Sequence, residues 1–121
     1  MKTLKEYLED IFEPLYEMAN LDYRHTGFTD NNLIMYVSTK QGSNGPRVKV
    51  FFKGQPSNSI SFSIEKEPKM FDNKSNLRLS KRDISEIKYW ISINHVILLK
   101  FWNSNSANVL IADLLDNIDK I

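Results

Sequence analysis

The stretch PRVKVFFKGQPSNSISFSIE, residues 46–65, decides the fold because it alternates apolar and polar residues in two successive runs. Side chains of a β-strand point to the two faces of a sheet in turn, so this alternation predicts strands with one buried face. The apolar positions are expected to face a core: Val48, Val50, Phe52, Ile60, Phe62 and Ile64. The positions between them predict a second face that is wet and cationic.

The residues around this stretch extend the predicted sheet. A further strand is expected over 33–39, and the turn sequence QGSNG at 41–45 separates it from the strand at 46–53. Together with the strand at 59–65, these segments predict a three-stranded antiparallel meander. Polar or proline-containing sequence predicts irregular connections at 20–32 and 66–76.

The segments before and after the predicted strands have apolar residues at the spacing of a helix. Thr3 and Glu6 match a capping box at the start of an N-terminal helix, and Pro14 is expected to kink or break this helix. Ser80 and Asp83 match a second capping box at the start of a long helix. One apolar side of that helix is expected to cover the sheet: Ile84, Ile87, Ile91, His95, Leu98 and Trp102.

The long helix carries a second apolar group, Tyr89, Ile93 and Val96, roughly opposite the first. A surface helix needs only one apolar side, so a second one predicts a further contact. Either the last helix, which is apolar along one side as far as Ile121, or an external partner is expected to cover it. The predicted fold is α+β in a single domain, with an N-terminal helix, a three-stranded antiparallel meander and two C-terminal helices packed on one sheet face.

Composition excludes several classes of protein. The chain of 121 residues contains no cysteine, which excludes disulfides and thiolate chemistry. No apolar run approaches the ~20 residues of a membrane-spanning helix, and no leader is expected. We therefore expect a cytoplasmic protein without a membrane partner, and its oligomeric state is left open.

The net charge of +1 conceals an uneven distribution along the chain. Residues 1–30 carry −4, residues 31–82 carry +7 and residues 83–121 carry −2. A basic centre between acidic ends is typical of a surface that binds a polyanion. The same distribution is expected if the acidic helices fold onto the sheet and neutralise it.

The best candidate site lies on the cationic face of the strand at 46–53. Arg47, Lys49 and Lys53 share this face with Phe51, and such a group suits backbone phosphates with stacked bases, or a protein partner. The alternative is a solvated face whose basic residues discourage aggregation between strands, or one covered by the acidic N-terminal helix.

Histidine gives little support for catalysis. The loop DYRHTGFTD contains residue types that a metal-free ribonuclease uses for phosphate binding and proton transfer: Asp22, Tyr23, Arg24, His25 and Asp30. His95 lies on the apolar side of the long helix and is expected to be structural. No metal, cofactor or nucleotide motif is present, so no catalytic residue, cofactor or metal ligand is assigned.

Residues 46–103 contain a Pro-led strand, PRVKVFF, a second strand, ISFSIE, and the helix LSKRDISEIKYWISINHVILLKFWN. This order resembles a family of small uncharacterised bacterial proteins, often encoded in suspected toxin–antitoxin pairs, with a Pro-Pro-His-Phe-His-Val strand and a Trp-containing helix. The corresponding positions are Pro46, Val50, Trp90, Ile91, Asn94, Leu98 and Trp102. The two family histidines are replaced, at Arg47 or Val48 and at Lys49, so the resemblance implies the strand-then-helix architecture and no imidazole chemistry.

These observations favour a small non-enzymatic protein-binding module in a bacterial defence, toxin–antitoxin or mobile-element setting. The alternative is a nucleic-acid-binding protein, or a metal-free ribonuclease toxin, that uses the basic strand face. A protein partner is expected in the first case and nucleic acid in the second.

Overall fold

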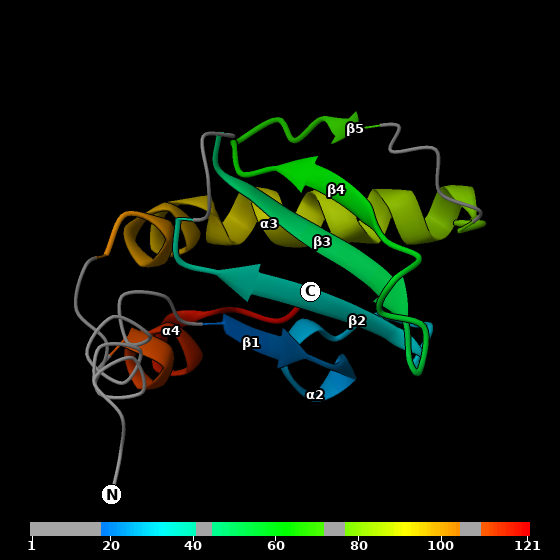
Figure 1. Cartoon of the computed structure of the whole chain (residues 1–121), viewed down its shortest axis with the longest axis horizontal. Coiled ribbons are helices and arrows are strands. Elements are labelled where there is room, and N and C mark those ends of the chain that lie inside the picture. Colours follow the sequence, from blue (N-terminus) through cyan, green and yellow to red (C-terminus); the bar gives the residue numbers. More distant parts are fainter. Residues whose placement is uncertain (1–17, 41–44, 72–76, 105–109) are drawn as a thin grey trace, which may run out of the picture.

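The computed structural model describes residues 18–40, 45–71, 77–104 and 110–121, which form a five-stranded sheet and three helices (Figure 1). The strand order is β1-β2-β3-β4-β5, and every neighbouring pair is antiparallel. The strands are β1 (Met18–Leu21), β2 (Leu33–Ser38), β3 (Arg47–Phe52), β4 (Ile60–Ser63) and β5 (Met70–Phe71). The helices are α2 (Tyr23–Thr26), α3 (Lys81–Trp102) and α4 (Leu110–Asn117). The predicted α+β class is confirmed.

The central hairpin, β3 and β4, has the predicted side-chain phase. Val48 lies opposite Phe62, and Val50 lies opposite Ile60. Val48 and Val50 expose 1% and 0% of their surface, whereas Lys49 between them is exposed. A slip of one residue would bury the lysine and expose both valines, so the predicted phase of β3 is confirmed. The second face was expected to be wet throughout, but Ser61 and Ser63 of β4 expose only 2% and 7% of their surface.

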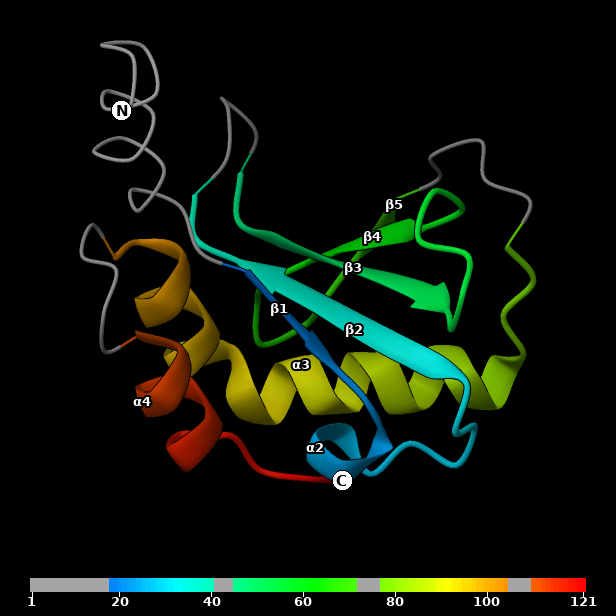
Figure 2. The same cartoon turned by 60° about the horizontal axis from the view of Figure 1, so that its bottom comes forward.

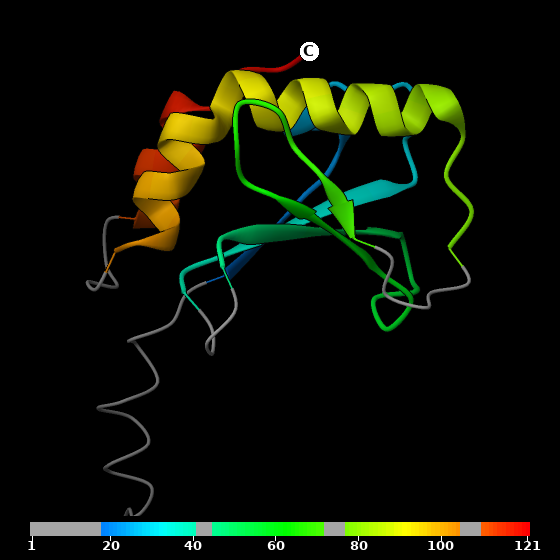
Figure 3. The same ribbon diagram turned by 90° about the horizontal axis from the view of Figure 1, so that it is seen from above.

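The core forms between this face of the sheet and α3, which lies across it (Figure 3). Most residues of the predicted core are buried: Val48, Val50, Phe62, Ile64, Ile87, Ile91 and Leu98. Three others are only partly buried: Phe52, Ile60 and Ile84. Phe52 ends β3 and Ile60 begins β4, so both lie at one end of the hairpin rather than at its centre.

Helix α3 begins where its capping box predicts. The Asp83 backbone N–H donates to Ser80 Oγ at 3.0 Å, and the Ser80 N–H donates to Asp83 Oδ2 at 3.2 Å. The helix then runs for 22 residues along the sheet. Trp90 and Trp102 lie on its inner side and expose 0% and 4% of their surface.

Both edges of the sheet differ from the prediction. Residues 18–21, expected partly as helix and partly as loop, form β1, which pairs with β2. Residues 70–71, expected as an irregular connection, form β5 beside β4. Segments of four and two residues are too short to show a period of their own, so pairing with the neighbouring strand decides their conformation. The sheet therefore has five strands rather than three.

The predicted loop before β2 also contains a short helix, α2. Asp22 is its N-cap and accepts from the Arg24 N–H at 3.0 Å, while Gly27 ends it in the left-handed region with φ 76°. The end of the chain returns to this turn, where the Ile121 N–H donates to the Thr26 carbonyl at 3.0 Å (Figure 2).

Helix α4 lies beside the C-terminal half of α3 (Figure 2) and ends at Asn117. The prediction of helix up to the final residue is therefore wrong. The predicted N-terminal helix, with its capping box and Pro14, lies outside the described residues.

Candidate functional site

Tyr89, Ile93 and Val96 form an apolar stripe on the outer side of α3, the α3 stripe. Their spacing of four and three residues places them on one side of the helix. They expose 58%, 38% and 71% of their surface, respectively. The prediction that the last helix covers this group is wrong.

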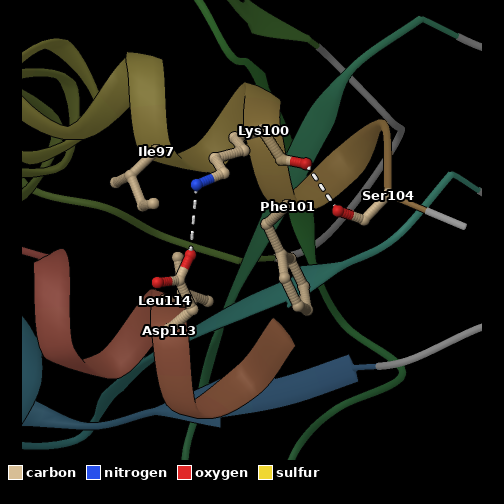
Figure 4. Close-up of a pocket in the computed structure, with 6 residues that line it drawn as sticks. All are labelled: Ile97, Lys100, Phe101, Ser104, Asp113 and Leu114. Carbon is tan, nitrogen blue, oxygen red and sulfur yellow. Dashed lines mark hydrogen bonds and ion pairs between the residues drawn. The ribbon is translucent and has the colours of Figure 1, made fainter. Parts of the chain in front are cut away.

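Helix α4 packs on a different flank of α3. Leu114 approaches Ile97 and Phe101, where the two helices leave a pocket of only about 10 Å³ (Figure 4). Such a space holds about one water molecule at most, so the helices are in close contact. At about 100° per residue, Ile97 and Phe101 lie between the α3 stripe and the core, and α4 therefore leaves the stripe uncovered.

Charged residues of both signs surround the α3 stripe. Arg82 and Lys100 are exposed and lie on the same side of α3, one beyond each end of the stripe. The Glu86 carboxylate accepts from the backbone N–H and the hydroxyl of Thr29, both at 2.8 Å. Lys100 Nζ lies 3.5 Å from Asp113 Oδ2 (Figure 4), and an ion pair so exposed contributes little energy.

The face of the sheet turned away from α3, the outer sheet face, is the second candidate surface (Figure 3). Cross-strand pairing aligns one residue of each strand across it: Asn20, Tyr36, Lys49, Ser61 and Phe71. The five described strands contain no acidic residue, whereas β3 contains Arg47 and Lys49. The strand residues therefore give this face a positive charge, and an acidic group lies close by, the Glu65 carboxylate after β4, which accepts from the hydroxyl of Ser63 opposite Arg47.

A shallow groove of about 180 Å³, the outer groove, lies on this face. It is lined by Asn20, Tyr36, Lys49, Phe51 and Pro56. Phe51 was expected to offer an open ring, but it exposes only 7% of its surface. Its cross-strand neighbour on this face is the buried, apolar Ile34. The Phe51 ring is therefore part of the groove wall rather than a free platform.

Two cation–π contacts position the basic side chains. The guanidinium carbon of Arg47 lies 4.9 Å from the centroid of the Phe71 ring, and Lys49 Nζ lies 6.0 Å from the centroid of the Tyr36 ring. Neither ring could be expected beside its cation from the sequence, because the paired residues are far apart along the chain. Only the strand register brings these side chains together.

Lys53, predicted to share the cationic face, follows the end of β3 and does not line the outer groove. Its backbone N–H donates to the Asn32 carbonyl at 2.7 Å, and its side chain is exposed. The structure therefore brings Arg47, Lys49 and Phe51 together on β3 and leaves Lys53 in the following turn.

The residues considered for a ribonuclease stabilise a turn. Arg24 donates to the Asp22 carboxylate from Nε at 3.1 Å and from Nη2 at 2.9 Å, and this hydrogen bonding holds the pKa of Asp22 below its usual range. His25 Nδ1 lies 3.9 Å from Asp22 Oδ1, too far for a hydrogen bond. Asp30 accepts from the Asn32 N–H at 2.9 Å. The carboxylates are thus engaged locally, and no His25–Asp22 acid–base pair is formed.

His95 is half-buried, and its Nδ1 lies 2.7 Å from the carbonyl oxygen of Ser92 in the same helix. Within the described ranges, no three His, Asp or Glu side chains are grouped so that they could hold a metal ion. None of the helices in this part of the chain combines the length and the apolar character that crossing a membrane requires.

No protein-family model, curated protein or solved structure matches the chain. The resemblance of residues 46–103 to small bacterial proteins from suspected toxin–antitoxin pairs therefore stays a prediction. Any functional proposal therefore rests on the α3 stripe and the outer sheet face.

Proposed function

We propose that the chain is a small non-enzymatic protein-binding module and that the α3 stripe contacts the partner. The observation that carries the proposal is the exposure of three large apolar side chains on one side of a helix whose opposite side is packed in the core. Apolar side chains gathered in a patch mark interaction sites, whereas scattered ones need no explanation. Tyr89 also belongs to a residue type enriched among the dominant residues of interfaces.

The α3 stripe supplies only part of the energy that such a complex needs. Full burial of one large apolar side chain contributes about 1.5–3 kcal/mol, and these three are already partly covered. Their further burial would contribute about 3–5 kcal/mol together, while association costs about 4–15 kcal/mol. The partner therefore has to reach beyond the stripe, onto the polar surface around it.

The charges around the stripe indicate the chemistry of the partner. Arg82 and Lys100 are exposed at its two ends, and the carboxylates of Glu86 and Asp113 lie on the same part of the surface. A partner segment with an apolar side would complement this surface best if acidic residues met Arg82 and Lys100 and basic residues met Glu86 and Asp113. We therefore favour an amphipathic segment of another protein, with charges of both signs beside its apolar side.

The sequence resemblance extends the proposal to a biological setting. Residues 46–103 resemble proteins of suspected toxin–antitoxin pairs. A module that binds one protein product encoded nearby, in a bacterial defence or mobile-element system, agrees with the absence of a catalytic motif from the sequence. The identity of the neighbouring genes tests this setting directly.

The binding proposal is tested by a pull-down from extract of the source organism after nuclease treatment. We expect the wild-type chain to retain one protein and both Ile93→Glu and Val96→Glu to lose it, because burying an unpaired carboxylate in the apolar contact is costly. Leu115→Glu is the matched control, since Leu115 of α4 exposes 36% of its surface and Ile93 exposes 38%.

Circular dichroism should first show that all three variants keep the wild-type fold. Capture that survives both stripe substitutions, or that Leu115→Glu abolishes equally, would contradict the proposal. Capture that nuclease treatment alone abolishes would also count against it, because the retained protein would then be held through nucleic acid.

A further inference from the structure

The outer groove and the cations beside it suit a ligand different from that of the α3 stripe. The two surfaces lie on opposite sides of the molecule, because the stripe faces away from the sheet and the groove lies on the face turned away from α3 (Figure 3). We infer that the outer sheet face binds single-stranded nucleic acid, with one base in the outer groove and adjoining phosphates at Lys49 and Arg47. This inference does not rest on the proposed protein partner.

The size of the outer groove limits what it can hold. Its volume is about 180 Å³. Sites for whole cofactors or metabolites usually enclose about 300–1,000 Å³. The groove therefore takes one group of a larger ligand, such as a single base of a polynucleotide, and the rest of that ligand lies on the surrounding sheet.

The lining residues match the parts of a base. Tyr36 provides aromatic surface, on which a base of any sequence can stack, and the almost fully buried Phe51 forms part of the wall beside it. Asn20 is exposed at the groove, and its side-chain amide can both donate to and accept from the polar edge of a base. Lys49 is exposed at the same groove and provides a cation for the attached phosphate.

Arg47 provides a second cation on the same face. It precedes Lys49 by two residues of β3, so the two backbone positions are about 7 Å apart. Its guanidinium is already held over the Phe71 ring, and its Nε donates to the Gly45 carbonyl at 3.3 Å. A side chain ordered in this way loses less conformational freedom when it binds a phosphate.

The combination of groups distinguishes nucleic acid from an acidic protein segment. Both ligands would gain from a cationic face whose strands contain no acidic residue. An Asp or Glu side chain, however, has no ring to place against Tyr36. A nucleotide uses the cation, the amide and the aromatic walls of the groove together, and we therefore favour it.

The test is fluorescence anisotropy with a labelled oligouridylate of about 12 nucleotides, a length within the range that single-strand binding sites cover. Titrations across about 50–200 mM salt should give a log K against log salt slope of about −1.4, since each of two phosphate contacts contributes about −0.7. Lys49→Gln should reduce the magnitude of the slope by about 0.7. Lys81→Gln, which removes an exposed cation at the start of α3, is the matched control and should leave the slope unchanged.

A second variant tests the groove itself. Tyr36→Leu keeps an apolar side chain in β2 but removes the aromatic face, and the affinity should fall about fivefold or more. If Tyr36→Leu does not fold, Lys49→Gln still tests the inference, because Lys49 is exposed and its substitution should leave the fold intact. Ile93→Glu on the opposite side should not change oligonucleotide binding, which separates this inference from the proposed protein contact.

Three results would overturn the inference. The first is no binding at the lowest salt concentration. The second is an equal loss of slope in Lys49→Gln and Lys81→Gln, which would indicate diffuse attraction without a site. The third is displacement of the oligonucleotide by polyglutamate at equal concentration, with the same dependence on Lys49, which would assign the face to an acidic protein segment.

Discussion

The side chain of Asn94, in the middle of α3, holds the backbone of Asp119 by two hydrogen bonds. Asn94 Nδ2 donates to the Asp119 carbonyl at 2.9 Å, and the Asp119 N–H donates to Asn94 Oδ1 at 2.7 Å. Nδ2 also donates to the Trp90 carbonyl at 2.9 Å, and Asn94 exposes only 2% of its surface. This buried amide fastens the segment after α4 to α3, close to the contact between Ile121 and α2.

Replacing Asn94 should loosen the end of the chain. Asn94→Leu removes both partners of the Asp119 backbone and should lower the free energy of unfolding by about 1–3 kcal/mol in urea titrations. The Ile121 amide should also exchange its hydrogen faster. Asn103→Leu, at an exposed asparagine whose side chain donates to the Leu99 carbonyl in the same helix, should change stability by less than about 0.5 kcal/mol. Equal effects of the two substitutions would contradict this account.

Trp90 should be the most costly side chain to truncate. It is fully buried and meets Phe28 edge to face, with ring centroids 6.4 Å apart. Trp90→Ala should therefore lower the free energy of unfolding by about 3–5 kcal/mol. Trp90→Phe should cost less, because the indole N–H that it removes has no hydrogen-bond partner among the described residues. A urea midpoint of Trp90→Ala equal to that of wild type would contradict the burial.

The parts of the fold that the sequence predicts are those whose pattern is local. Alternation in β3 and the capping box at Ser80 depend on neighbouring residues, and both are confirmed. β1 and β5 depend on pairing with another strand, so no local pattern marks them. The packing side of α4 was not predictable either, because α3 offers an apolar stripe and an apolar flank, and tertiary packing chooses between them.

Part of the candidate site can likewise be predicted from a local pattern, and part of it cannot. The strand phase is enough to place Arg47 and Lys49 on one face. The outer groove, in contrast, combines residues from β1, β2 and β3 with Pro56 from the following loop. Only the cross-strand register and the path of that loop define it, and neither can be read from one segment of the sequence.

Gly27 should tolerate no side chain. Its φ of +76° disfavours any other residue, and a Cβ there would lie 3.0 Å from the Ile121 carbonyl oxygen. Gly27→Ala should therefore lower the free energy of unfolding by about 1–2 kcal/mol or more. Gly45→Ala is the control, because a Cβ at Gly45 meets nothing within 4 Å. Thermal unfolding should show Gly45→Ala as neutral or slightly stabilising, and a similar loss in both variants would contradict the argument.

The contact between Asp22 and Arg24 makes a small part of the free energy of unfolding depend on pH in the acidic range. Hydrogen bonding from Arg24 lowers the pKa of Asp22 from its ordinary value of 3.8. A carboxyl group with a lowered folded-state pKa contributes stability above its unfolded pKa and loses this contribution as the pH falls through the folded-state pKa. The loss should therefore begin only as the pH falls to about 4 and below.

The pKa of Asp22 can be followed by NMR titration of its carboxyl carbon. Arg24→Gln should raise this pKa toward 3.8, whereas Arg82→Gln, at a distant exposed arginine, should leave it unchanged. The accompanying change in stability should be small, because the pair is largely exposed. A wild-type Asp22 that titrates at or above 3.8 would contradict the contact.

The phase of α3 makes the sharpest prediction, because two identical residues lie two positions apart on it. Ile91 is fully buried in the core, whereas Ile93 belongs to the α3 stripe and exposes 38% of its surface. Ile91→Ala should lower the free energy of unfolding by about 2–5 kcal/mol, since it removes packed methyl groups and leaves a cavity. Ile93→Ala should lower it by less than about 1 kcal/mol, because the isoleucine is already half in water and alanine favours the helix. Urea titrations of the two variants measure this contrast directly. Equal losses would mean that Ile93 is buried in solution. The α3 stripe would then be part of the packed protein rather than a surface for a partner.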